Sequence, residues 1–215
     1  MDPKPHIQLR PEGFKVILLA ILATLVFAFL GWAVPALLGL VATALTLNFF
    51  RDPDRVIPND PDVAVAPADG RVVLVQARQD PFTGEQKKCI GIFMNIFNVH
   101  VNRFPIAGQV TSIKYYPGKF IKASLDKAST DNERCALLIT DQEQKNWTVV
   151  QIAGLVARRI VCLAQPGDFL SRGKRFGIIK FGSRVDLYLP QEYESVVNVG
   201  EKTFAGQSIV ARKAS

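Results

Sequence analysis

The sequence predicts a mainly β domain of barrel-sandwich type, preceded by an N-terminal hydrophobic helical hairpin. Three features predict it: an uncharged run of 35 residues near the N-terminus, a series of short Val-, Ile- and Phe-rich runs after it, and a glycine-bounded turn that occurs twice. The 215 residues suffice for one domain of about 150 residues and a smaller segment. We therefore expect a hairpin over residues 1–50 and a β-rich domain over residues 51–215.

The hairpin is expected because residues 16–50 contain no charge. A single helix of that length would measure about 52 Å, whereas the hydrocarbon core of a bilayer is about 30 Å thick. The segment Gly31–Pro35 supplies a flexible point, an interfacial tryptophan and a helix breaker. We predict helices over 14–31 and 35–50. Each is near the lower length limit for a span, so two spans and a re-entrant hairpin in one leaflet both stay open.

A signal peptide is the competing interpretation, because basic residues precede the apolar run. The run, however, continues past the small residues at 33–36 where cleavage would occur. Basic residues flank both of its ends: Lys4, Arg10 and Lys15, then Arg51 and Arg55. A hairpin places both flanks on one side, and the positive-inside rule makes that side the cytoplasm. We therefore expect the chain at the cell membrane, anchored on the cytoplasmic face.

Composition excludes several classes of protein. The chain is 48% hydrophobic, too apolar for disorder, and its three cysteines form no CxxC pair that would indicate a zinc site or a disulfide scaffold. The net charge of +7 comes without a dense Lys/Arg run or an aromatic-basic signature, which argues against nucleic acid as a partner. A solvated basic surface and attraction to anionic lipid headgroups remain, and the apolar run favours the lipid.

The rest of the chain predicts strands. A polar, proline-rich connector over 51–61 cannot be helical. Apolar runs between turn residues predict strands, and residues 122–132 predict a short helix or ordered loop. The runs are 71–75, 89–93, 110–115, 136–139, 148–152, 156–163, 176–180, 185–189 and 208–211. The pattern G-[DE]-x4-G occurs at 167–173 and 200–206 and resembles the turns of lipoyl-type barrel-sandwich domains, although generic turn chemistry would also explain it.

Three residues of the β domain are candidates for chemistry. Asp69 precedes a glycine at the start of a strand, where an ordinary Asp-Gly turn is the alternative. His100 lies among apolar residues, and the alternative is a hydrogen-bonded core histidine; His6, the other histidine, precedes the hairpin. Ser183 follows Gly182 in an otherwise continuous strand hairpin, where a turn or bulge is the alternative.

Six motifs in one order give these residues a common context: FFRDPDR, APADGRVV, FNVHVNRFPIAG, YYPGKF, ASTDNER and FGSRVDLYLP. Over about residues 49–210 the chain resembles the short bacterial and archaeal form of the phosphatidylserine decarboxylase family. The resemblance implies a self-processing enzyme in which Ser183 attacks the carbonyl of Gly182. Elimination from the resulting ester would leave a large chain 1–182 and a small chain 183–215, the latter beginning with a pyruvoyl group derived from Ser183.

The resemblance also implies roles for other residues. His100 would take the proton from Ser183, and Asp69 would orient the imidazole. The pyruvoyl cofactor would form a Schiff base with the amine of an anionic aminophospholipid, phosphatidylserine, and release carbon dioxide and phosphatidylethanolamine. No metal is required. Arg103 stands where longer relatives have a second histidine; a guanidinium is no base at neutral pH, so we expect it to bind the substrate carboxylate or phosphate.

Alternatives remain at this point. Ether lipids carry the same headgroup, so an archaetidylserine decarboxylase stays open, as does a homo-oligomer. A non-enzymatic, membrane-anchored adaptor module would explain the glycine turns but would leave Asp69 and His100 without a role. A serine hydrolase using Ser183 would usually show a G-x-S-x-G elbow, which residues 181–185 lack.

Overall fold

The computed structural model describes residues 7–155, 159–180 and 182–214. By packing, the chain divides into two units. The first ends at Asp54 and includes Phe97–Val99, and the second comprises Arg55–Ile96 and the chain from His100 onward.

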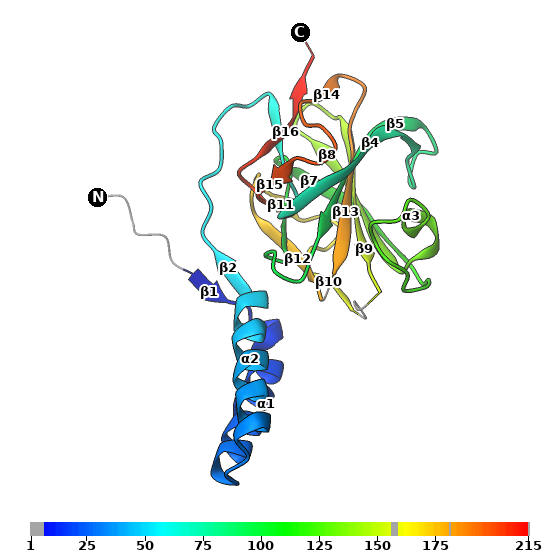
Figure 1. Cartoon of the computed structure of the whole chain (residues 1–215). Coiled ribbons are helices and arrows are strands. Elements are labelled where there is room, and N and C mark those ends of the chain that lie inside the picture. The colour runs from blue at the N-terminus through cyan, green and yellow to red at the C-terminus, as the bar shows by residue number, and fades with distance from the viewer. Residues whose placement is uncertain (1–6, 156–158, 181, 215) are drawn as a thin grey trace, which may run out of the picture. The chain divides into compact units, whose positions relative to one another are not determined.

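The first unit is a helical hairpin (Figure 1). A short strand β1 (Ile7–Leu9) and a 3-10 turn (Pro11–Gly13) lead into α1 (Phe14–Phe29), which is followed by α2 (Ala33–Phe49) and β2 (Arg51–Pro53). Because β1 pairs antiparallel with β2, both ends of the hairpin lie together. The two predicted helices are confirmed. Helix α2 begins two residues earlier than predicted because Pro35 falls in its first turn, where a backbone N–H has no helical partner. Strand β2, inside the connector, was not predicted.

The two helices pack closely through small residues. A Cβ on Gly39 would lie 2.6 Å from Thr24 Oγ1, and the hydroxyls of Thr24 and Thr43 are 3.3 Å apart. Such contacts are typical of helices that pack within lipid. The outward leucines are exposed, Leu19 to 68% and Leu38 to 65%. Among the described residues one helical segment, Pro11–Phe29, is long and apolar enough to cross a bilayer, and α2 is shorter.

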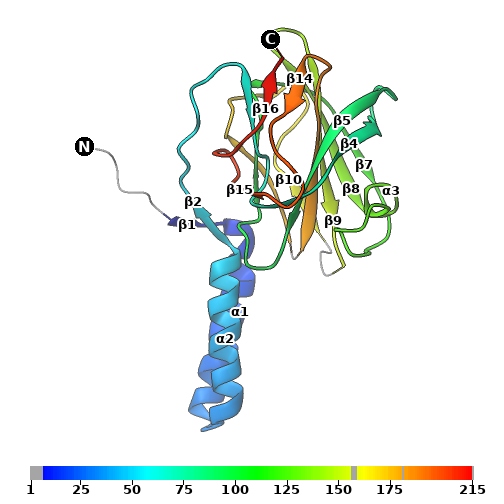
Figure 2. The same ribbon diagram turned by 45° about the horizontal axis from the view of Figure 1, so that its top comes forward.

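The second unit is mainly β, as predicted. Its largest sheet has eight strands in the order β11-β7-β8-β9-β13-β5-β4-β15 and curls around the core (Figures 1 and 2). The strands are β4 (Gly70–Gln79), β5 (Gln86–Met94), β7 (Gly108–Tyr116), β8 (Arg134–Asp141), β9 (Asn146–Ala153), β11 (Phe169–Leu170), β13 (Ser183–Tyr188) and β15 (Lys202–Thr203).

Two three-stranded sheets complete this unit. One has the order β10 (Ile160–Cys162), β12 (Arg175–Ile179), β6 (Val101–Arg103), and the other has the order β14 (Tyr193–Ser195), β16 (Ile209–Lys213), β3 (Val63–Val65). Within 122–132 only α3 (Ala128–Asp131) is helical. Of the strand predicted at 156–163, residues 156–158 lie outside the described residues.

The two glycine-bounded turns have the same conformation. The first and last glycines of each turn all have positive φ, at 96° and 79° for Gly167 and Gly173, and at 99° and 77° for Gly200 and Gly206. The turns meet: a Cβ on Gly206 would lie 3.6 Å from the Cα of Gly173. The repeat therefore marks two equivalent corners that pack on each other.

Strand β13 lies inside the large sheet, because its six residues pair with β5 on one side and β9 on the other. Alternate side chains point to opposite faces of the sheet. We call inner face the side that bears Ser183, Val185 and Leu187, which adjoins the main hydrophobic core. We call outer face the side that bears Arg184, Asp186 and Tyr188, where a smaller cluster packs under α3.

Candidate functional site

The Gly182–Ser183 peptide lies at the very start of β13. Gly182 has φ +61°, in the left-handed region that favours glycine. Ser183 is fully buried and pairs with Met94 at the end of β5 and with Ala153 at the end of β9. A Cβ on Gly154 would lie 2.0 Å from the carbonyl oxygen of Gly182. The carbonyl group at the predicted cleavage site therefore packs against the backbone of Gly154, where any side chain would collide with it.

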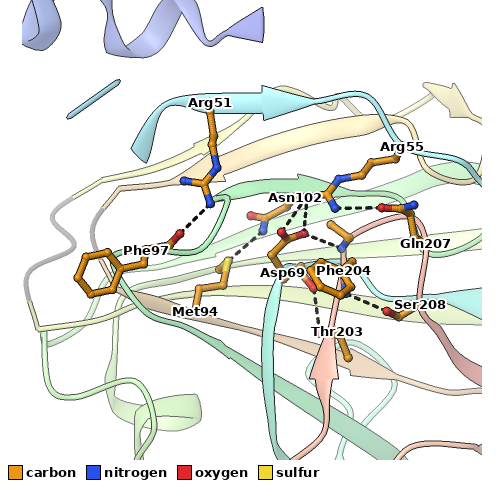
Figure 3. A network of polar contacts seen from close by, with 12 residues as sticks. Arg51, Arg55, Asp69, Met94, Phe97, Asn102, Thr203, Phe204, Gln207 and Ser208 are labelled. Atoms are coloured by element: carbon orange, nitrogen blue, oxygen red, sulfur yellow. Dashed lines mark hydrogen bonds and ion pairs between the residues drawn. The ribbon is translucent and has the colours of Figure 1, made fainter. Parts of the chain in front are cut away.

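The inner face beside Ser183 carries a small polar group of buried residues. Ser183 Oγ lies 4.0 Å from the sulfur of Met94, and Asn102 Nδ2 lies 3.8 Å from the same sulfur (Figure 3 shows the second contact). Gln151 Nε2 donates to Asn102 Oδ1 at 2.8 Å. Asn102 belongs to β6, so this group joins the eight-stranded sheet to the three-stranded sheet that faces it.

Asp69 is held by an arginine from the first motif. Arg55 Nη2 donates to both carboxylate oxygens, at 3.0 and 2.8 Å, and the backbone N–H of Ala205 donates to Oδ1 at 2.7 Å (Figure 3). Arg55 Nη1 also donates to Gln207 Oε1. Since both side chains of the ion pair are less than a tenth exposed, this is a buried, charge-assisted contact that fixes the carboxylate.

His100 and Arg103 lie at opposite ends of the same short strand, His100 just before it and Arg103 as its last residue. His100 is fully buried and immediately precedes β6. Arg103 is buried too, and its Nη1 donates to the carbonyl of Gly173 at 3.1 Å. A Cβ on Gly206 would lie 3.1 Å from Arg103 Cδ, so the arginine packs where the two glycine turns meet. Its predicted contact with substrate stays a prediction.

The end of β6 and the residues after it run antiparallel to the segment that leads to Asp69. Val65 N–H donates to Pro105 O, and Arg103 N–H donates to Pro67 O. Each of these residue pairs forms a single hydrogen bond, because the proline has no N–H that could donate in the opposite direction. The chain thereby brings positions 67 and 103 opposite each other, two residues from Asp69 and three from His100.

On the outer face, Arg184 and Asp186 form a fully buried ion pair. Both contacts, Nε to Oδ1 and Nη2 to Oδ2, measure 2.7 Å. Arg184 Nη1 also donates to the carbonyls of Ala123 and Leu125, at 3.3 and 3.1 Å. Burial alone would lower the pKa of Arg184, but the Asp186 carboxylate raises it above its ordinary value. The guanidinium stays charged and ties β13 to the segment before α3.

Two further motifs meet at the end of β9. Asn132, fully buried, donates to Ile121 O and to Ala153 O, and accepts from Ile121 N. A Cβ on Gly118 would lie 2.5 Å from the carbonyl carbon of Asn132. YYPGKF and ASTDNER are therefore packed together, and they support Ala153, the residue that pairs with Ser183.

A pocket of about 660 Å³ opens on the outer face. It is lined by Arg78, Asp80, Tyr116, Arg134 and Tyr188, among others. The side chain of Ser183 points to the other face of the sheet, so this pocket is separate from the predicted cleavage site.

Sequence reasoning missed four residues that build the site: Arg55, Asn132, Gln151 and Gly154. Arg55 and Asn132 lie within two of the six motifs, so the motifs were a signal for them. Gln151 and Gly154 stand in the strand 148–152 or just after it, where nothing in an apolar run marks a polar or glycine position as special.

Comparisons with known proteins agree with the motifs. The sequence model of the family described as phosphatidylserine decarboxylase matches residues 42–211. Three curated relatives carry the name phosphatidylserine decarboxylase proenzyme. That of Nitratidesulfovibrio vulgaris is 58% identical (97% of this chain, 96% of the relative), that of Solidesulfovibrio magneticus 54% (98% and 99%), and that of Burkholderia ambifaria 48% (96% and 97%). With the family model covering most of the chain and such relatives covering nearly all of it, this chain belongs to the phosphatidylserine decarboxylase family.

Proposed function

We propose that this chain cleaves itself between Gly182 and Ser183 and then converts phosphatidylserine to phosphatidylethanolamine and carbon dioxide. The observation that carries the proposal is the placement of this peptide. Ser183 is buried at the head of a doubly paired strand, Gly182 takes a left-handed conformation, and its carbonyl lies against Gly154. The relatives' names, which specify phosphatidylserine and a proenzyme, support the same reaction.

Self-cleavage needs Ser183 Oγ to attack the carbonyl carbon of Gly182 while a base removes the hydroxyl proton. We assign the base to His100 and its orientation to Asp69. The antiparallel pairing of 65–67 with 103–105 supports this, because it brings the two segments that carry Asp69 and His100 together. Arg55 holds the Asp69 carboxylate in a fixed position, as an orienting group requires.

The residues around position 183 fit a pyruvoyl group made there. Once formed, this group would supply an electrophilic carbonyl that withdraws the electron pair left when carbon dioxide departs. The two ladders of β13 and the Arg184 ion pair would hold the new chain end in place. Buried Met94, Asn102 and Gln151 would exclude water from it, and His100 would return a proton to the product.

Membrane attachment is the remaining part of the proposal. The outward apolar side chains of α1 and α2 and the close contact of Gly39 with Thr24 support an anchor within lipid. Basic residues at both ends, which β1 and β2 bring together, support the cytoplasmic face. We expect the full chain to remain with membranes after an alkaline carbonate wash. Release into the supernatant would contradict an integral anchor.

Mass spectrometry of the purified protein tests the central claim. We expect a small chain of 33 residues, about 3.6 kDa as 33/215 of 23.7 kDa, without a free amino terminus. Ser183→Ala should leave one intact, inactive chain, whereas the matched control Ser195→Ala should cleave normally. An intact wild-type chain that still releases carbon dioxide would overturn the proposal. An intact chain that releases none would also overturn it and would favour the adaptor or hydrolase alternative. Thin-layer chromatography with ester- and ether-linked phosphatidylserine analogues decides between the two lipid backbones.

A further inference from the structure

The inner face holds one buried amide that is only half satisfied. Gln151 is fully buried, and its Nε2 donates to Asn102 Oδ1, but its Oε1 has no hydrogen-bond partner among the described residues. Buried polar atoms are nearly always paired in folded proteins, so an acceptor left over calls for an explanation.

This amide lies close to the proposed reacting position. In the register of β9 and β13, Ser183 faces Ala153 and Val185 faces Gln151, so Gln151 and Ser183 are diagonal neighbours on the inner face. Asn102 connects them by a second route, because Met94 contacts both Asn102 Nδ2 and Ser183 Oγ. Gln151 is therefore within reach of a group bound at residue 183.

The surroundings set which end of the amide is left over. Asn102 Nδ2 donates to the Met94 sulfur, so Asn102 Oδ1 is the atom that faces Gln151. Since Oδ1 only accepts, Gln151 must donate to it through Nε2. Within the described part of the chain, the Gln151 Oε1 atom is then left as the unpaired acceptor. Opposite, β12 has a glycine: a Cβ on Gly177 would lie 2.7 Å from Gln151 Nε2. The absence of a side chain at position 177 on the facing strand therefore makes room for the amide group of Gln151.

We infer that Gln151 Oε1 accepts a hydrogen bond from the amino group of the substrate headgroup and holds that nitrogen beside residue 183. This inference rests on the proposed function. An amide oxygen only accepts, so it suits a primary amine and repels a carboxylate or a phosphate. It is also no base, so the proton that the amine must lose goes elsewhere. Gln151 orients the headgroup with its nitrogen, and not its carboxylate, toward the reacting end.

Gln151→Met tests the inference, because methionine has similar length and no oxygen. The variant should cleave like the wild type, as read by the mass of the small chain. Cleaved protein is then incubated with phosphatidylserine in mixed micelles and cyanoborohydride. The headgroup nitrogen bonds to the terminal carbonyl carbon with loss of water, hydride fixes the link, and the small chain gains mass. We expect this labelling and decarboxylation both to slow at least tenfold, whereas Gln109→Met, an exposed glutamine on β7, should match the wild type.

The outcomes separate the inference from the function it rests on. If cleaved Gln151→Met is labelled at the wild-type rate, the inference is overturned. It is also overturned if Gln151→Met folds but stays uncleaved, because the amide would then serve the cleavage step. If that variant fails to fold, Gln151→Glu decides. Its carboxyl keeps an acceptor oxygen whether it is ionised or protonated, so the cleaved variant should still be labelled, and loss of labelling in folded, cleaved Gln151→Glu would overturn the inference. Failure of the wild-type chain to cleave would instead contradict the proposed function.

Discussion

The two faces of β13 differ in how their polar groups are satisfied. On the outer face, the guanidinium of Arg184 has four hydrogen bonds, to Asp186 and to two backbone carbonyls. On the inner face, the Ser183 hydroxyl lies 4.0 Å from a sulfur, and Gln151 keeps an oxygen unpaired among the described residues. Fully hydrogen-bonded polar groups stabilise a fold, whereas a buried polar atom without a partner is costly, and a role in chemistry is one reason for keeping it. The comparison predicts that inner-face changes alter the reaction and outer-face changes alter stability.

The largest effect is expected from Gly154→Ala. The added methyl would lie 2.0 Å from the Gly182 carbonyl oxygen and would displace the carbonyl group that we propose Ser183 attacks. A misplacement of about 1 Å costs on the order of a hundredfold in rate, so we expect cleavage to slow by at least about that factor. A time course of newly synthesised precursor on a denaturing gel measures it. Cleavage at the native rate would show that the carbonyl is not held where the structure places it.

Arg184→Met tests whether the outer face of β13 serves stability. It leaves the Asp186 carboxylate buried without its ion-pair partner, and such a loss lowers the free energy of unfolding by about 3–5 kcal/mol. Chemical denaturation measures this, and the double variant Arg184→Met/Asp186→Leu should recover part of the loss. If the single variant is as stable as the wild type but fails to cleave, the outer face acts in the chemistry, and the expected difference between the two faces is wrong.

Asn132→Ala is expected to have a smaller effect. It removes the side chain that bonds Ile121 and the carbonyl of Ala153, and leaves that buried carbonyl short of a donor, at a cost of about 1–3 kcal/mol. Thermal unfolding measures it, with Asn198→Ala, an exposed asparagine, as the control. An unfolding temperature equal to that of the wild type would show that β9 does not depend on this tie.

The smallest effect concerns pH. Burial raises the pKa of Asp80, but hydrogen bonds from Phe82 N, Thr148 Oγ1 and Thr83 N and the charge of Lys87 outweigh burial and lower it below its ordinary value. The stabilisation is thus present above the unfolded pKa and is lost as pH falls through the folded pKa. We expect Asp80→Asn to flatten the acid side of the stability curve, because the variant no longer titrates at this position. An unchanged stability curve would show that other carboxylates dominate the pH dependence of stability at acid pH.

The sequence predicted the long strands well, because apolar runs such as 89–93 and 148–152 become central strands. It missed β3, β6 and β14, which have three residues each and lack an apolar pattern long enough to recognise. In the site, motifs pointed to Ser183, His100 and Asp69. Sequence could not pair Asp69 with Arg55, 14 positions away, or set Gly154 against Gly182, because such contacts exist only once the strands are in register.

One consequence of the pairing of β13 extends beyond the reaction. Both ladders of this strand start at residue 183, and downstream β16 pairs with β3 in the sheet that it shares with β14. Breaking the peptide bond before Ser183 would therefore cut the backbone without disrupting the hydrogen bonds of any of these strand pairs. The two products would remain interlocked as one folding unit, and separating them would require a denaturant rather than dilution.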